Sequence, residues 1–253
     1  MNDQIKRKKI RSYFKRSHPG GAAIPVVVGV LVVILALGAR APEVAAGVGV
    51  LFFAIALLWF FVAITRQLRR PSDEEMDRWL EDDLNQFVKR TYDRLGLQEH
   101  NQRRKPLVIR GPILWSTVGV PNKDLLWKKG KDDIVRFAVY RVTVIHLDEQ
   151  LLAAYACDFN FLKNVSLNEE TDEYHYRNIA SVSTHEISTS YKLPNGKSLV
   201  HAQAFRLSVV SGENIQVTIG SAKLAELTGG TIPTTEAETA VQVIRTILRD
   251  KLR

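Results

Sequence analysis

The chain of 253 residues lacks the sequence motifs that mark most catalytic, redox and metal sites. Its one cysteine, Cys157, can form no intramolecular disulfide, and without a Cys-x-x-Cys pair the chain offers no zinc or redox motif. It also lacks a glycine-rich phosphate loop, a His-Glu-x-x-His pair and a Gly-x-Ser-x-Gly elbow. We therefore expect a non-enzymatic protein of a reducing compartment, with no cofactor, no metal and no catalytic residue.

Two stretches near the N-terminus lack charge altogether. Residues 22–38 and 44–64 contain no Asp, Glu, Lys or Arg, and five residues join them. At about 1.5 Å per residue they would span roughly 26 and 32 Å as helices, against about 30 Å for the hydrocarbon core of a bilayer. We therefore expect a two-helix transmembrane hairpin over residues 22–64.

The cations around these runs are unevenly distributed. Ten Lys or Arg residues lie in the basic tail of residues 1–21 or directly after the second run, whereas the connecting loop holds only Arg40. Cytoplasmic flanks of membrane helices carry an excess of Lys and Arg. We predict a multi-pass protein of the bacterial cytoplasmic (inner) membrane with both termini in the cytosol. The residues expected at the anionic lipid surface are Lys6, Arg7, Lys8, Lys9, Arg11, Arg66, Arg69 and Arg70.

Two features of the apolar runs leave alternatives open. The first run also fits a cleaved signal peptide, because Ala39-x-Ala41 resembles a small-residue cleavage site, although its apolar core is long for such a peptide. In the second run, Ala45, Gly47 and Gly49 form a small-residue face. Such a face packs a hairpin internally or joins copies of the chain, so a homo-oligomer stays open.

The net charge of +8 belongs to the N-terminal part alone. Residues 1–70 carry a net +9, and residues 71–253 carry 24 Lys or Arg against 25 Asp or Glu. A domain that binds nucleic acid needs a basic face of its own. We therefore expect membrane lipids and another membrane-associated protein as partners, and no nucleic acid.

The remainder of the chain predicts a membrane-anchored α+β protein. Residues 65–106 combine an amphipathic helix, opened by a capping box of Ser72 and Glu75, with a polar linker. From residue 107 onward the pattern changes to alternating strands, with a long hairpin over residues 134–162. An amphipathic pattern with basic residues at its end closes the chain. We expect an antiparallel sheet or barrel of about seven strands with a C-terminal helix.

This arrangement resembles the bacterial pleckstrin-homology-like (bPH) family over residues 107–250. The matching segments are the hairpin Arg141–Phe161, the aromatic pair and Ile-x-x-Val of Tyr174–Val182, and the hairpin Phe205–Ile219. The chain departs from the family at Arg177-Asn178, where an acid often precedes the isoleucine, and in the stretch Ser190–Leu199. The resemblance implies a PH-like domain over residues 107–253 that recognises protein or lipid as a scaffold or adaptor. An oligomeric structural or gating component is the alternative.

One expected loop mixes aromatic and basic side chains. Trp127, Lys128, Lys129 and Lys131 have the composition of a contact with a lipid interface or an acidic partner. A polar hairpin loop with Leu125 and Trp127 tucked into the core is the preferred interpretation.

The only cluster of acids and histidines lies around His175 and His185. A metal site needs converging ligands with a supporting shell, and nothing in the spacing fixes one. A solvated turn is therefore the preferred interpretation, and an enzyme built on this cluster ranks last among the functions considered.

Overall fold

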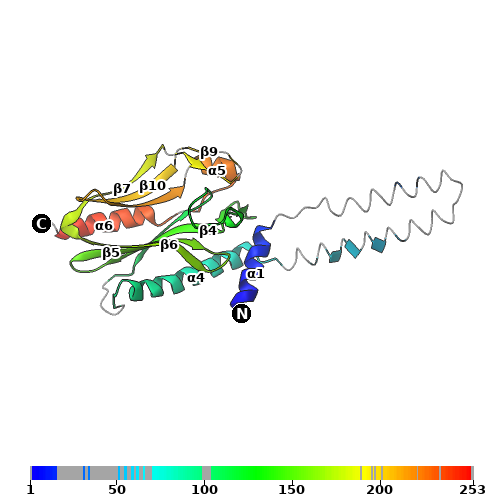
Figure 1. Cartoon of the computed structure of the whole chain (residues 1–253), viewed down its shortest axis with the longest axis horizontal. Helices are drawn as coiled ribbons and strands as arrows, with labels where there is room; N and C mark the ends of the chain where they lie inside the picture. Colours follow the sequence, from blue (N-terminus) through cyan, green and yellow to red (C-terminus); the bar gives the residue numbers. More distant parts are fainter. Residues whose placement is uncertain are drawn as a thin grey trace. The chain divides into compact units, whose positions relative to one another are not determined.

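The computed structural model describes residues 2–15, 70–98 and 104–188, most of residues 190–251, and a few positions between residues 31 and 65 (Figure 1). Its helices are α1 (Asp3–Phe14), α4 (Asp73–Arg94), α5 (Ala222–Thr228) and α6 (Ala237–Lys251), with the 3-10 turns η2 (Asn122–Asp124) and η3 (Tyr176–Asn178). Its strands are β1 (Leu107–Pro112), β2 (Trp127–Lys129), β3 (Val135–Phe137), β4 (Val139–Leu147), β5 (Leu151–Asn160), β6 (Val165–His175), β7 (Ile179–Ile187), β8 (Tyr191–Lys192), β9 (Ser198–Leu199), β10 (Ala202–Val209) and β11 (Asn214–Gly220).

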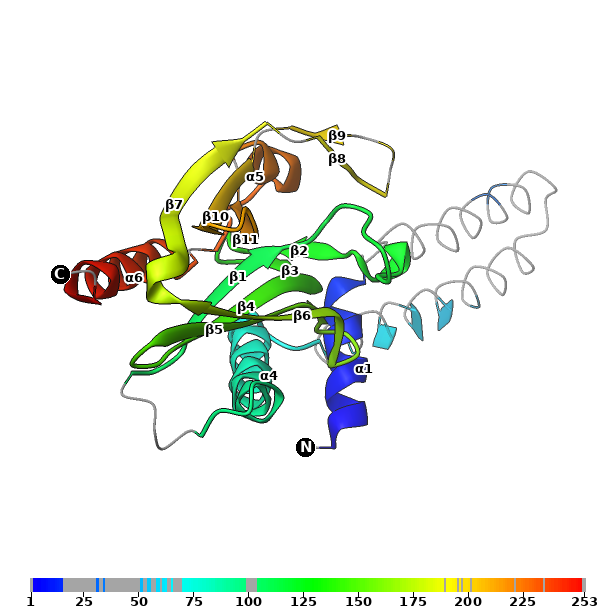
Figure 2. The ribbon, with the colours of Figure 1, turned by 60° about the vertical axis from the view of Figure 1, so that its left-hand side comes forward.

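Two antiparallel sheets make up most of the β domain. The first has the strand order β1-β4-β5-β6 and the second has the order β11-β10-β7, while β2-β3 and β8-β9 form separate ribbons. The chain passes from the first sheet to the second through η3, between β6 and β7 (Figure 2). Because β6 and β7 each end a sheet and do not pair with one another, the two sheets do not close into a barrel. The barrel form of the expected fold was therefore wrong.

The four-stranded sheet lies between two layers: α4 packs on one face, and the three-stranded sheet with α6 packs on the other. On one face, Val142 and Val144 of β4 join a core with α4, where the ring of Phe87 packs against Tyr155 at a centroid distance of 5.3 Å. On the other face, Ile145 joins a core with the three-stranded sheet and α6. Burying one such aromatic ring contributes roughly 1.5–3 kcal/mol, so both faces of the sheet add to the free energy of folding.

Two local predictions are confirmed. The side chain of Ser72 accepts a hydrogen bond from the amide of Glu75 (3.2 Å), and the Glu75 carboxylate accepts one from the amide of Ser72 (3.1 Å), so the capping box opens α4. The hairpin expected over residues 134–162 is formed by β4 and β5, which pair from Val139 and Asn160 to Leu147 and Leu152.

The predicted membrane hairpin has no counterpart among the helices that the structure describes. None of them, within residues 2–15, 70–98 and 104–251, is both long and apolar enough to cross a membrane. Only α4 reaches 22 residues, and charged side chains occupy more than half of its positions. This finding contradicts the membrane-anchored fold class and the multi-pass localisation. Residues 22–38 and 44–64 themselves lie almost wholly outside the described residues.

The backbones of the two sheets approach each other closely at Gly111 of β1. A Cβ atom added there would lie 1.6 Å from the backbone oxygen of Thr218 in β11. We expect Gly111→Ala to lower the free energy of unfolding by about 3 kcal/mol or more, because two backbones would have to separate and open the core between them.

Gly220→Ala is the matched control for this substitution. A Cβ at Gly220 would meet only the side chain of Ile232, at an ordinary 3.5 Å, so its effect should stay within about 1 kcal/mol. Urea unfolding measures both variants. Equal stability of the two variants would show that the sheets do not approach as described.

Candidate functional site

β6 offers an open edge of the four-stranded sheet. No strand in the described part of the chain pairs with its outer side (Figure 2). At its end the amide of Tyr176 donates to the carbonyl of Gln150 (3.4 Å), and such hydrogen-bonded pairs recur at every second residue of an antiparallel ladder. The backbone N–H and C=O groups of Thr171, Glu173 and His175 therefore point away from β5, toward the open side.

The regular part of this edge begins after Asn168. That residue has a left-handed backbone (φ 52°), and the register with β5 shifts between Ala156 and Asp158. The Asn168 side chain donates to a carboxylate oxygen of Asp158 (2.6 Å) and to the carbonyl of Val118 (2.8 Å), which holds the irregular turn in place. The edge available to another strand therefore spans residues 170–175.

Acidic side chains gather along β6. They are Glu169, Glu170, Asp172 and Glu173. Glu169 lies 3.4 Å from Arg94 of α4, and Glu170 pairs with Arg141 of β4. Like charges on neighbouring strands repel, so this edge disfavours acidic strands and favours a strand that carries Lys or Arg.

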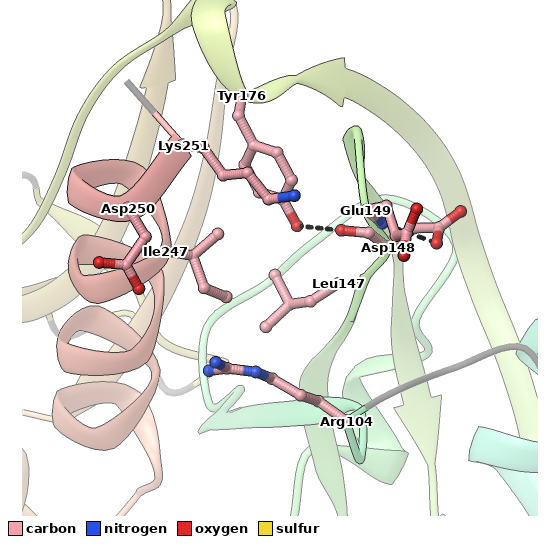
Figure 3. Close-up of a pocket in the computed structure, with 8 residues that line it drawn as sticks. All are labelled: Arg104, Leu147, Asp148, Glu149, Tyr176, Ile247, Asp250 and Lys251. Carbon is pink, nitrogen blue, oxygen red and sulfur yellow. Dashed lines mark hydrogen bonds between the residues drawn. The ribbon is translucent and has the colours of Figure 1, made fainter. Parts of the chain in front are cut away.

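A small pocket lies where β6 ends (Figure 3). Its volume is about 160 Å³, and it is lined by Arg104, Leu147, Asp148, Glu149, Tyr176, Ile247, Asp250 and Lys251. The side chains of Leu147 and Ile247 line it between α6 and the end of β4, and the Tyr176 hydroxyl points toward Asp148 (Figure 3). Both charge signs line the pocket, and small-molecule sites usually measure about 300–1,000 Å³. The pocket therefore has room for a single polar side chain, not for a cofactor.

Tyr176 is the fixed element of this pocket. Its side chain is 4% exposed, and its hydroxyl donates to the backbone oxygen of Asp148 (2.9 Å). Burial, together with the negative charge of Asp148, raises the pKa of Tyr176 to about 12, against an opposing effect of Arg104. The phenol therefore stays neutral at physiological pH, and its hydroxyl remains a hydrogen-bond donor at the side of the pocket.

The predicted aromatic and basic loop is partly a strand. Trp127, Lys128 and Lys129 form β2, which pairs with β3, and Lys131 follows in the turn. The Lys128 ammonium lies 3.8 Å from the centroid of the Tyr13 ring, and Lys129 binds Asp133 (2.5 Å). These cations have partners within the protein, and their contact with lipid or an acidic partner stays a prediction.

The first half of the basic tail is the helix α1. Arg7 is 7% exposed, and its guanidinium donates to both carboxylate oxygens of Asp83 in α4, at 2.5 and 2.9 Å. The Lys6 ammonium donates to the same carboxylate at 2.6 Å. The structure therefore places two of the predicted lipid-surface cations in a buried ion-pair network.

Arg7 keeps its positive charge in this network. Burial alone lowers the pKa of Arg7, but hydrogen bonds to Asp83 and Asp3 outweigh it and raise the pKa above its ordinary value. Of the remaining predicted lipid-surface cations, Lys8 and Arg11 are exposed on α1 and Arg70 is half-buried. The Lys9 ammonium lies over the ring of Trp79. Arg66, Arg69, Ala45, Gly47 and Gly49 lie outside the described residues.

The acid and histidine cluster does not converge. His175 pairs with Leu151 in the four-stranded sheet, whereas His185 pairs with Ala204 in the other sheet. Within the described ranges, no group of three or more His, Cys, Asp or Glu side chains is placed to hold a metal ion.

α1 was expected only as a basic tail and not as part of the folded domain. The spacing of Ile10, Tyr13 and Phe14, which are all buried, marks one face of a helix and could have indicated it. The open edge of β6 carries no such local mark, since strand order depends on the whole sheet.

No protein-family model, no curated protein and no solved structure matches this chain. The bPH resemblance therefore stays a prediction.

Asp83 is the acceptor on which the docking of α1 depends. We expect Asp83→Asn to lower the free energy of unfolding by about 3 kcal/mol, because it removes the carboxylate that binds Lys6 and leaves the buried Arg7 paired only with the exposed Asp3. Urea unfolding and limited proteolysis within α1 measure the effect. Asp82→Asn, at an exposed position of the same helix, is the control, and equal stability of the two variants would contradict the role of Asp83.

His146 of β4 is buried against α4 and predicts a pH dependence. Thr91 Oγ1 lies 2.7 Å from both the Val88 carbonyl and His146 Nε2. Since a carbonyl only accepts, the hydroxyl proton goes to Val88, and Nε2–H donates to Thr91. The buried Nδ1 then has no partner among the described residues. Desolvation lowers the pKa of His146 to about 4, from an ordinary 6.5.

Because the unfolded chain binds this proton more tightly, His146 should destabilise the fold as the pH falls from about 6.5 to 4, by about 3 kcal/mol in total. Denaturant unfolding at several pH values across this range gives the free energy of unfolding. This free energy should depend less steeply on pH in both His146→Gln and His146→Phe than in the wild type. An unchanged slope in the two variants would rule out a neutral, buried His146.

Proposed function

We propose that the β domain is a non-enzymatic recognition module that binds an extended segment of a partner protein along the outer edge of β6. The observation that carries the proposal is the row of outward-facing backbone groups at Thr171, Glu173 and His175, next to a strand-free side within the described residues. Strand addition at such an edge supplies main-chain hydrogen bonds, and pockets for alternate side chains supply specificity.

The surroundings of the edge support this function. Its acidic side chains favour a partner segment rich in Lys or Arg. Charged side chains on an edge strand also reduce non-specific pairing with other strands. The edge ends at the Tyr176 pocket and at an adjoining hollow of about 510 Å³ lined by residues that include Gln150, His175 and Arg177. A partner strand that runs to the end of β6 could place one side chain there.

The family resemblance agrees with the proposal. The resemblance implies antiparallel strands followed by a C-terminal helix, and here α6 follows the two antiparallel sheets and joins their shared core. We propose this kinship as the structural basis of a recognition role.

Glu173→Pro tests the edge directly. Proline removes one outward-facing N–H and leaves the ladder with β5 intact, so stability should change little. Binding of a partner segment should weaken about tenfold or more, since one intermolecular hydrogen bond is lost and the ring obstructs the approaching strand. Glu173→Ala keeps the N–H and controls for loss of the carboxylate.

Partner segments for this test are obtained by photo-crosslinking the full-length chain in cells. A photoreactive residue at position 173 should capture a basic, extended segment, and the same residue at the exposed Glu238 of α6 should not. The synthetic segment should then slow hydrogen exchange at the amides of residues 171, 173 and 175. Equal capture at both positions, or wild-type affinity of the proline variant, would refute the proposal.

A further inference from the structure

A second surface feature lies on the other side of the four-stranded sheet, between α4 and β1. It is a groove of about 740 Å³ whose walls include Leu80, Leu84 and Val88 of α4 and Leu107 and Val108 of β1. The side chains of Val88, Leu107 and Val108 are only partly buried, so part of this apolar surface meets solvent.

The groove is long and follows one face of α4. Its lining residues on that helix run from Asp77 to Val88 at spacings of three and four, which is one helical face. Eleven steps of 1.5 Å give a length of about 17 Å, or three helical turns. An occupant of that length and shape is an amphipathic helix lying beside α4.

The two walls differ in charge. Asp77 and Glu81 line the side of α4, whereas Lys105 and Arg110 line the side of β1. The Asp77 carboxylate is partly neutralised by Arg136, which binds both of its oxygens (2.7 and 2.6 Å), but Glu81 is exposed. A complementary helix carries basic residues toward α4, acidic residues toward β1 and an apolar ridge between them.

The opposite flank of α4 already binds a helix of this kind. There α1 places Lys6 and Arg7 on Asp83 and packs its apolar residues into the core (Figure 2). The groove lies along the other flank of α4 and has the same kinds of side chain: carboxylates on the helix and aliphatic side chains beneath them. The same helix therefore has the composition to bind basic amphipathic helices on both flanks.

We propose that this groove binds an amphipathic helix of about three turns from a partner protein, with its basic side toward α4. This surface is separate from the β6 edge and does not depend on the proposed strand addition. Glu236, near the start of α6, also lines the groove and favours a cation at that end.

The test is a display library screened against the full-length chain. Its members are helices of about 14 residues with a fixed ridge of Leu and with Lys, Glu or Gln at the flanking positions. The full-length Asn85→Trp variant serves for counter-selection, because Asn85 lines the groove at an exposed position and an indole there fills it. Gln86→Trp, at the next exposed position of α4, is the matched control that leaves the groove open.

The expected result is enrichment of helices with Lys along one flank and Glu along the other. A selected peptide should bind the wild type and Gln86→Trp equally, bind Asn85→Trp at least about tenfold more weakly, and lose several-fold in affinity to Glu81→Lys. These differences should shrink with added salt in the Glu81→Lys comparison.

Three outcomes would overturn the proposal. No enrichment over the Asn85→Trp counter-selection would show that the groove binds no such helix. Binding of a fatty acid, blocked by Asn85→Trp, with no peptide binding would make the occupant a small amphiphile. Self-association of the wild type that Asn85→Trp abolishes would make it a second copy of the chain.

Discussion

The structure depends on one constraint, the burial of β4 and β5 on both faces. In β4 only Arg141 is less than fully buried, and in β5 only Leu151. Strands that are apolar on both sides need a covering layer on each side. The helices α4 and α1 supply one layer, and the three-stranded sheet with α6 supplies the other. The remaining features follow from how these layers fit.

The helical layer is held by charge as well as by packing. α4 carries its acids around much of its circumference, and one of them, Asp83, is 1% exposed. A buried carboxylate is costly unless it is paired, which makes the cations of α1 a requirement of the fold. At the start of α4, Arg136 of β3 binds Asp77 and Asp132 in a similar way. Ion pairs therefore join α4 to elements on both sides of it.

The two proposed recognition surfaces lie at the margins of the four-stranded sheet. A helix with its side chains is about 10–12 Å wide, whereas four strands spaced at about 4.8 Å make a broader layer. One helix cannot cover such a sheet, and α1 covers only one flank of α4. The uncovered margin beside β1 is the groove. The edge of β6 is open for a different reason: among the described residues no strand pairs with its outer side.

The membrane hairpin predicted from hydropathy is the expectation that the structure contradicts. None of the helices in the described ranges could span a bilayer, and residues 22–38 and 44–64, on which the prediction rested, lie almost wholly outside those ranges. Local patterns performed well: the Ser72 capping box and the hairpin of β4 and β5 depend on neighbours within a few positions or across one turn. The strand β2 lies in a stretch that was expected as a polar loop or an irregular hairpin, because three residues that pair only with β3 are too few for alternation to mark them.

The sequence by itself determined the elements whose causes are local, namely caps, turns and the alternation of buried side chains. Only the tertiary structure decided that Arg7 meets Asp83, 76 positions away, and that β6 rather than β5 ends its sheet. The physical reason is that ion pairs and strand order depend on which residues lie close together in the folded chain. The separation of two residues along the sequence does not show whether they are close in space.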